Sequence, residues 1–134
     1  MLKIAKSVEY ALLALRYISR KSEPSSAKEI SERLNIPYDL LAKILQKLCK
    51  NEVISSLQGT KGGYLLYKEF SKTSLNEIII ALEDRIQLTD CMVDNPGREA
   101  CQRYDDCCLV NPMSKMQNKL VALFENTYLD EIIN

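Results

Sequence analysis

The segment spanning residues 91–108 restricts the fold of this chain more than any other. It contains four of the five cysteines, and Pro96 and Gly97 inside it interrupt any helix or strand. Met92 and Val93 are its main large apolar side chains, so the segment has no packed core of its own. Bonds from thiolates to a metal centre can supply the folding energy that apolar burial cannot supply here. We therefore expect this segment, the cysteine loop, to take its shape from a metal.

The cysteine content favours metal or redox chemistry over a disulfide framework. No run approaches the roughly 18 apolar residues of a membrane span, and the first residues lack a secretory cleavage pattern. We expect a cytoplasmic protein, in which clustered thiols stay reduced and bind metals. The absence of histidine excludes a histidine ligand or general base. Thiolates are soft ligands suited to an iron-sulfur cluster or to zinc, although no tight Cys-x-x-Cys knuckle is present.

The charge of the chain is distributed unevenly, although its net charge is zero. Residues 1–73 contain 13 Lys and Arg against 7 Asp and Glu, whereas residues 74–134 contain 5 against 11. Such a split suggests that the first part meets a polyanion. At 134 residues the chain is long enough for one compact core and a projecting helix.

The first fifty residues predict three helices. Apolar residues recur at helical spacing from Ser7 to about Arg20, and a Ser-x-x-Glu capping box at 26–29 starts a short second helix. After a turn at 35–37, a third helix buries one leucine-rich side. Its exposed face is formed by Tyr38, Asp39, Ala42, Lys43, Gln46, Lys47 and Lys50. Two helices joined by a short turn, the second basic outside, indicate a helix-turn-helix.

A β-hairpin is predicted directly after these helices. The β-prone runs at 53–57 and 64–67 flank the glycine-rich tip at 58–63. A helix-turn-helix followed by such a hairpin describes a winged helix, and glycines at its tip would let the main chain approach DNA closely.

The remaining residues predict two further helices separated by the cysteine loop. A capping box at 74–77 starts a helix whose apolar side runs from Leu75 to Ile86. After the loop, Asn111 as N-cap and Pro112 in the first turn begin a helix expected to reach about Ile133 and to span roughly 30 Å. Its surplus apolar surface favours pairing with a second copy of the chain.

We thus expect a mainly α fold with a small β-hairpin wing. Residues 1–73 would form the winged-helix DNA-binding domain, and residues 74–134 the cysteine loop and a long dimerisation helix, in one compact unit with the first.

The sequence resembles a known family over nearly its whole length. The resemblance rests on residues 7–12 (Ser-Val-Glu-Tyr-Ala-Leu), residues 36–48, the wing residues 59–64 (Gly-Thr-Lys-Gly-Gly-Tyr) and three spaced cysteines before a long terminal helix. These features resemble the IscR/NsrR/RirA-type winged-helix transcription regulators, the Rrf-two family. The resemblance implies a homodimeric DNA-binding regulator, usually a repressor, in which an iron-sulfur cluster senses iron supply, nitric oxide or oxidants.

The same resemblance assigns the metal ligands. Cys91, Cys101 and Cys107 fit the cysteine triad of the family, around a cluster that is either 2Fe-2S or 4Fe-4S. By resemblance to the NsrR-like members, Glu9 of the other subunit would be the fourth ligand, although a solvated carboxylate beside Lys6 is an equal alternative. Cys108 is the rival fourth ligand. IscR-like members use a histidine there, which this chain lacks.

The predicted DNA contacts lie on the third helix and the wing. Lys43 and Lys47 would touch phosphates or a guanine edge, and Gln46 would reach an adenine. Lys61 at the wing tip would touch a phosphate, whereas Gln58 stands where many relatives have an arginine. A two-fold symmetric operator on double-stranded DNA requires the paired recognition helices to lie about 34 Å apart. The predicted contacts are Tyr38, Asp39, Ala42, Lys43, Gln46, Lys47, Gln58 and Lys61.

Two other functions remain open. A cluster-free regulator could respond through its thiols alone, and an iron-sulfur carrier would bind a protein partner instead of DNA. An enzyme is disfavoured, because the sequence offers no histidine, phosphate-binding loop or nucleophile paired with a base. Cys49, Tyr10 and Tyr17 are expected to pack within the fold.

Overall fold

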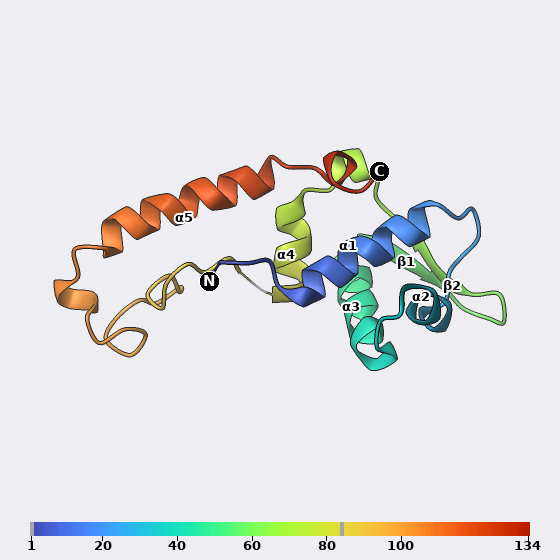
Figure 1. The fold of residues 1–134 in the computed structure, drawn as a ribbon, viewed down its shortest axis with the longest axis horizontal. Helices are drawn as coiled ribbons and strands as arrows, with labels where there is room; N and C mark the ends of the chain where they lie inside the picture. Colours follow the sequence, from blue (N-terminus) through green and yellow to red (C-terminus); the bar gives the residue numbers. More distant parts are fainter. Residues whose placement is uncertain (1, 84) are drawn as a thin grey trace.

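The computed structural model describes residues 2–83 and 85–134. Helices α1 to α4 and a hairpin form a globular body, and α5 extends away from it toward the cysteine loop (Figure 1). The α-helices are α1 (Lys6–Ser19), α2 (Ala27–Leu34), α3 (Tyr38–Lys50), α4 (Leu75–Glu83) and α5 (Val110–Glu125). The strands are β1 (Ile54–Leu57) and β2 (Gly63–Leu66), and the 3-10 helices are η1 (Phe70–Lys72), η2 (Tyr104–Asp106) and η3 (Leu129–Glu131).

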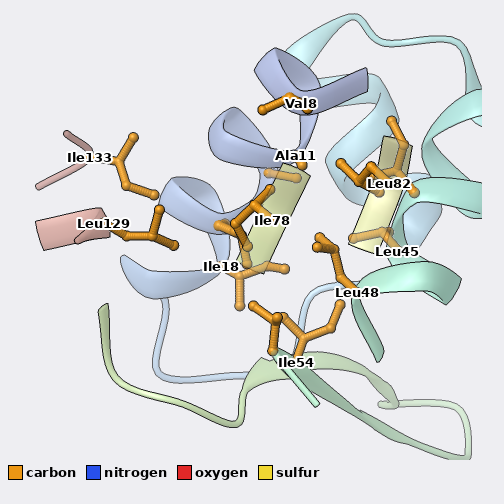
Figure 2. Close-up of a cluster of buried hydrophobic side chains, with 14 of the residues drawn as sticks. Val8, Ala11, Ile18, Leu45, Leu48, Ile54, Ile78, Leu82, Leu129 and Ile133 are labelled. Carbon is orange, nitrogen blue, oxygen red and sulfur yellow. The ribbon is translucent and has the colours of Figure 1, made fainter. Parts of the chain in front are cut away.

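The core is formed where α1, α3 and α4 meet. Leu15 of α1, Leu45 of α3 and Ile78 of α4 are fully buried, as the helical spacing of apolar residues requires. Leu129 and Ile133 from the end of the chain point into the same core (Figure 2). The core therefore draws on both residues 1–73 and residues 74–134.

The hairpin confirms the predicted wing, and a third segment of the chain, at Ser25, pairs with its second strand. Strands β1 and β2 pair antiparallel, with Ile54 opposite Leu66 and Leu57 opposite Gly63. On the other edge of β2, Tyr64 exchanges two backbone hydrogen bonds with Ser25, at 2.8 and 3.1 Å. The segment before α2 thus ties the wing to the helix-turn-helix. Together with α1 to α3, this arrangement is a winged helix.

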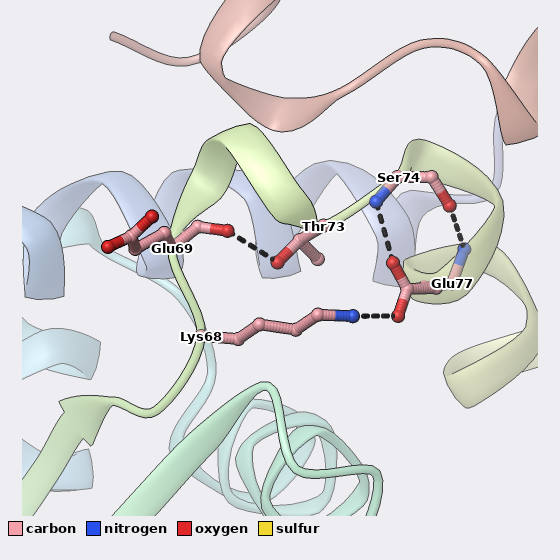
Figure 3. A network of polar contacts seen from close by, with 5 residues as sticks. All are labelled: Lys68, Glu69, Thr73, Ser74 and Glu77. Atoms are coloured by element: carbon pink, nitrogen blue, oxygen red, sulfur yellow. Dashed lines mark hydrogen bonds and ion pairs between the residues drawn. The ribbon is translucent and has the colours of Figure 1, made fainter.

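The two predicted capping boxes differ in the structure. Ser74 Oγ accepts from the Glu77 N–H at 3.2 Å, and the Glu77 carboxylate accepts from the Ser74 N–H at 2.7 Å (Figure 3). Lys68, just after the wing, donates to the same carboxylate. Burial raises the pKa of Glu77, but the Lys68 and Ser74 hydrogen bonds outweigh burial and lower the pKa below its ordinary value. The Lys68 contact to this reciprocal box ties the start of α4 to the segment that follows the wing.

The first box is satisfied on one side. Ser26 Oγ accepts from the Glu29 N–H at 3.1 Å, but both Glu29 carboxylate oxygens bind Lys21 at 2.8 Å. The Lys21 hydrogen bond is the main cause that lowers the pKa of Glu29. A nearby ammonium has therefore replaced the backbone amide as the partner of this carboxylate.

The predicted extent of the last helix is wrong. Helix α5 has Leu109, not Asn111, as its N-cap residue, and ends at Glu125 after 16 residues, about 24 Å at ~1.5 Å per residue. The Asn126 amide and the Thr127 hydroxyl each donate to a carbonyl four residues earlier, at 2.7 Å. The Thr127 carbonyl then accepts from the Leu75 N–H at 2.8 Å. These bonds turn the chain back toward the body.

The fourth helix also ends earlier in the sequence than predicted. Helix α4 ends at Glu83, and Ile86 lies outside it as a half-buried side chain packed against the core. Whether the helix includes Asp84 lies outside the described residues. In the part of the chain that the structure covers, no helix is both long and apolar enough to cross a membrane.

Candidate functional site

The outward face of α3 carries most of the predicted DNA contacts. Leu41, Ile44, Leu45 and Leu48 are buried, so the helix must present its other positions to solvent. The structure exposes Tyr38, Asp39, Lys43, Gln46 and Lys47 on this helix, and Ala42 is half-buried. The structure thus places these residues on one accessible, basic surface, and their contacts with DNA remain a prediction.

Lys47 differs from its neighbours because it also contacts α4. Its ammonium donates to the Leu82 carbonyl oxygen at 3.4 Å, near the carboxyl end of α4. Sequence reasoning missed this contact, because no local pattern shows which helix end lies beside a given lysine.

The glycines of the wing serve the fold of the wing itself. A Cβ atom on Gly62 would lie 2.2 Å from the Leu57 carbonyl oxygen, and one on Gly63 would lie 2.6 Å from the Ser25 carbonyl carbon. Close approach to DNA was the predicted reason for these glycines, whereas the close approach in the structure is to the chain's own backbone. Gln58 and Lys61 are both exposed at the tip, where DNA could reach them.

The cysteine loop has no buried side chain in the structure. Cys91, Cys101 and Cys107 are half-buried and Cys108 is exposed, and all are free thiols. Among the described residues, no three His, Cys, Asp or Glu side chains are close enough together to hold a metal ion. The structure therefore keeps the triad on one segment without assembling it into a site.

Two sulfur atoms of the triad have local hydrogen-bond partners. The Thr89 hydroxyl lies 3.2 Å from Cys91 Sγ, and the Leu109 N–H donates to Cys107 Sγ at 3.4 Å. In the contact between Thr89 and Cys91, either atom can be the donor. Thr89 was not among the predicted site residues, although it stands two residues before Cys91 in the sequence.

Glu9 lies on the first turn of α1, exposed and paired with Lys6 at 2.9 Å. The Glu9 hydrogen bond and charge raise the pKa of the Lys6 ammonium. In the single chain, Glu9 thus adopts the solvated ion pair that was the alternative to metal binding. Ligation of a metal by Glu9 from another subunit stays a prediction.

A groove of about 510 Å³ lies between α4, α5 and the cysteine loop. Cys91, Tyr104 and Gln117 line it, together with Asn76, a polar residue of α4 that is buried. Residues of α4, of α5 and of the cysteine loop thus line one groove.

Comparison with known proteins decides the family. The model of the Rrf2 family, described as an iron-dependent transcriptional regulator, matches residues 4–134. The chain belongs to the Rrf2 family of transcription regulators. The HTH-type transcriptional regulator IscR of Escherichia coli (strain K12 / DH10B) is 30% identical over 135 residues, which cover 99% of this chain and 81% of IscR. This Rrf2-family protein is therefore a DNA-binding transcription regulator rather than an enzyme.

Several solved structures match the structure of this chain. CymR (YrzC), the global cysteine regulator of B. subtilis, matches with a TM-score of 0.72 at 21% identity, covering 99% of this chain and 97% of CymR. IscR of T. potens matches with a TM-score of 0.72 at 20% identity, covering 98% and 85%. A putative transcriptional regulator from Listeria innocua matches with a TM-score of 0.73 at 26% identity, covering 97% and 85%. They confirm the winged-helix fold of this Rrf2-family chain.

Proposed function

We propose that this Rrf2-family regulator is a homodimeric, cytoplasmic repressor whose operator affinity is controlled by an iron-sulfur cluster held by Cys91, Cys101 and Cys107. The observation that carries the proposal is three free thiols on a loop that buries no described side chain. The family's iron-dependent description and the likeness to IscR support it.

The donor set fits such a cluster chemically. Three cysteine sulfurs are the soft donors that iron-sulfur clusters take, and a hydroxyl and a backbone N–H already lie beside two of them. When bound, the cluster would supply a centre that reacts with iron loss, nitric oxide or oxidants. Glu9 of a partner subunit or Cys108 would complete the ligand set, with 2Fe-2S and 4Fe-4S forms both compatible.

The chain's own residues would transmit the state of the loop. The loop joins the end of α4 to the start of α5, and Gln117 of α5 accepts from the Leu88 N–H at 2.9 Å. Ordering the loop would fix the angle between α4 and α5. Because α4 packs against α3, that angle would set where each recognition helix lies in a dimer.

A homodimer through α5 accounts for the apolar surface that this helix leaves uncovered. No side chain of α5 is buried in the described chain, and Met116 and Leu123 are 49% and 58% exposed. A second copy would cover this face under two-fold symmetry, and two recognition helices would then read half-sites one DNA turn apart. The exposed residues of α3, with Gln58 and Lys61 of the wing, would contact double-stranded DNA.

Anaerobic purification with matched cysteine variants tests the proposal. We expect wild-type protein to be brown, with iron and acid-labile sulfide in stoichiometric amounts. Cys101→Ala should be colourless and should change operator affinity by ~1 to 3 kcal/mol, the usual size of coupling between two sites. Cys49→Ala is the control, because Cys49 lies in α3, away from the loop. Colourless, iron-free wild-type protein with normal DNA binding would contradict the proposal.

The free thiols also support a second candidate, a cluster-free regulator that responds through thiol oxidation. Cys108 is exposed beside Cys107, so oxidants can reach the pair. This candidate predicts DNA affinity that changes with dithiothreitol in iron-free protein. An iron-sulfur carrier would instead show no steep loss of duplex binding with added salt.

A further inference from the structure

The carboxyl end of α4 is stabilised by a cation from the recognition helix. A helix carries partial negative charge at its carboxyl end, where a nearby ammonium is favourable. The last residues of α4, 80–83, are Ile, Ala, Leu and Glu, so the helix provides no cation there itself. Lys47 of α3 supplies one, with its Nζ 3.4 Å from the Leu82 carbonyl oxygen. This distance is long for a hydrogen bond, so the contact is weak enough to exchange.

A second contact holds the same turn from α1. The Ser7 hydroxyl donates to the Glu83 carboxylate, and the Leu82 side chain is buried in the core. The turn held by Ser7 and Lys47 is the last one before the segment that leads into the cysteine loop. This turn therefore lies between the cysteine loop and the exposed face of α3 that is proposed to contact DNA.

Lys47 also belongs to the exposed face of α3 that is proposed to contact DNA. It follows Lys43 by four residues, so both ammonium groups lie on the same side of α3. Lys43 is exposed and, among the residues the structure describes, makes no hydrogen bond or ion pair. A lysine side chain is a single point charge on a flexible stem. When the Lys47 ammonium turns outward to a DNA phosphate, it moves away from the Leu82 carbonyl of α4.

We propose that Lys47 couples DNA binding to the end of α4: the duplex takes its ammonium away from the Leu82 carbonyl, and the last turn of α4 loosens. Coupling between two sites is reciprocal, so an event that displaces the end of α4 changes the phosphate contact of Lys47 in return. The exchange itself needs only DNA. Its link to metal sensing rests on the function proposed above.

The test compares Lys47→Met with Lys43→Met, which both keep the apolar stem and remove the charge. The probe is a 30-base-pair duplex enriched from a random-sequence pool by the wild-type protein. Hydrogen–deuterium exchange of residues 80–83 is measured with and without the duplex, together with the salt dependence of binding. In wild-type protein and in Lys43→Met, we expect the duplex to speed exchange in this turn.

In Lys47→Met, we expect exchange in residues 80–83 to be fast already without DNA and to gain nothing from the duplex. Lys47→Arg, which keeps the charge, should restore the wild-type response. Each of the two methionine variants should lower the salt slope by about one unit, because each removes one phosphate contact.

The proposal is overturned if the duplex speeds exchange in Lys47→Met as it does in wild-type protein, or if Lys47→Met without DNA exchanges as slowly as wild type. A different result would show that the metal proposal is wrong. In that case, Cys101→Ala and metal-stripped wild type would bind the duplex as tightly as loaded protein, while the exchange pattern of the lysine variants would still decide the role of Lys47.

Discussion

Gly63 is one of two wing residues at which the fold depends on the absence of a side chain. Its φ is +154°, and a Cβ would lie 2.6 Å from the Ser25 carbonyl carbon and 2.7 Å from the Ser25 carbonyl oxygen. These are backbone atoms that pair with Tyr64, so they cannot move aside without breaking the bridge that ties the wing to α2.

Gly63→Ala should therefore destabilise the fold. We expect a loss of about 2 to 3 kcal/mol in the free energy of unfolding, in the upper range for single substitutions because backbone must shift. Urea denaturation followed by circular dichroism measures it. Gly97→Ala is the control, since a Cβ there meets nothing within 4 Å. Equal stability of the two variants would show that the wing can move away from Ser25.

At the same scale, the sequence predicts which residues form a local motif better than it predicts their partners. Both Ser-x-x-Glu boxes start a helix, as expected, because the serine bond depends only on residues three apart. The carboxylates behave differently, since Glu29 binds Lys21 and Glu77 binds both Ser74 and Lys68. Which cation lies nearby is decided by tertiary packing, which no local spacing encodes.

At the scale of elements, helical periodicity located each helix but not the ends of α4 and α5. Apolar residues recur from Met113 to Ile132, and they predicted a helix to about Ile133. The chain instead breaks at Asn126 and Thr127, whose side chains bond back to carbonyls of α5. Of the apolar residues after the break, Leu129 and Ile133 are buried in the core of the body, whereas Ile132 is exposed.

The break has a consequence for stability that a continuous helix would not have. Leu129 is fully buried in the core beside α1 and α4, whereas Ile132 is 42% exposed. Leu129→Ala should cost about 2 to 5 kcal/mol, as expected for a buried leucine, and Ile132→Ala should cost much less. Thermal denaturation of the two variants measures the difference. If the helix instead continued to residue 133 and packed against a partner subunit, the stability losses of both variants would depend on protein concentration.

At the scale of the whole molecule, the sequence could name the candidate ligands but not assemble them. Cysteine is the residue type that holds soft metals, so four thiols within eighteen residues identify the region. The loop buries no described side chain that would fix their arrangement. Under the proposed function, ligand bonds and the second subunit would fix it. The helices and the hairpin of the winged helix were predictable, since apolar packing within one chain sets their positions, whereas the bridge between Ser25 and Tyr64 was not.

Dimerisation is the property of the whole molecule that DNA binding should depend on most. Leu123 projects from α5 with 58% of its surface exposed, so Leu123→Glu leaves the monomer core intact. A glutamate buried without a partner in an apolar interface is costly, so this variant should be a monomer by sedimentation equilibrium. Leu57→Glu is the control, because Leu57 is similarly exposed at 51% but belongs to β1, a strand that lies away from α5 (Figure 1).

A monomer should also bind the enriched duplex at least about 100-fold more weakly, because the second half-site is no longer linked to the first. Because a monomer can touch only half as many phosphates, its salt slope should fall to about half of the wild-type value. Leu57→Glu should stay dimeric even if its own wing contacts weaken. A dimeric Leu123→Glu would place the subunit interface elsewhere than on α5, and a monomer with wild-type affinity and slope would mean that one winged helix suffices to bind the duplex.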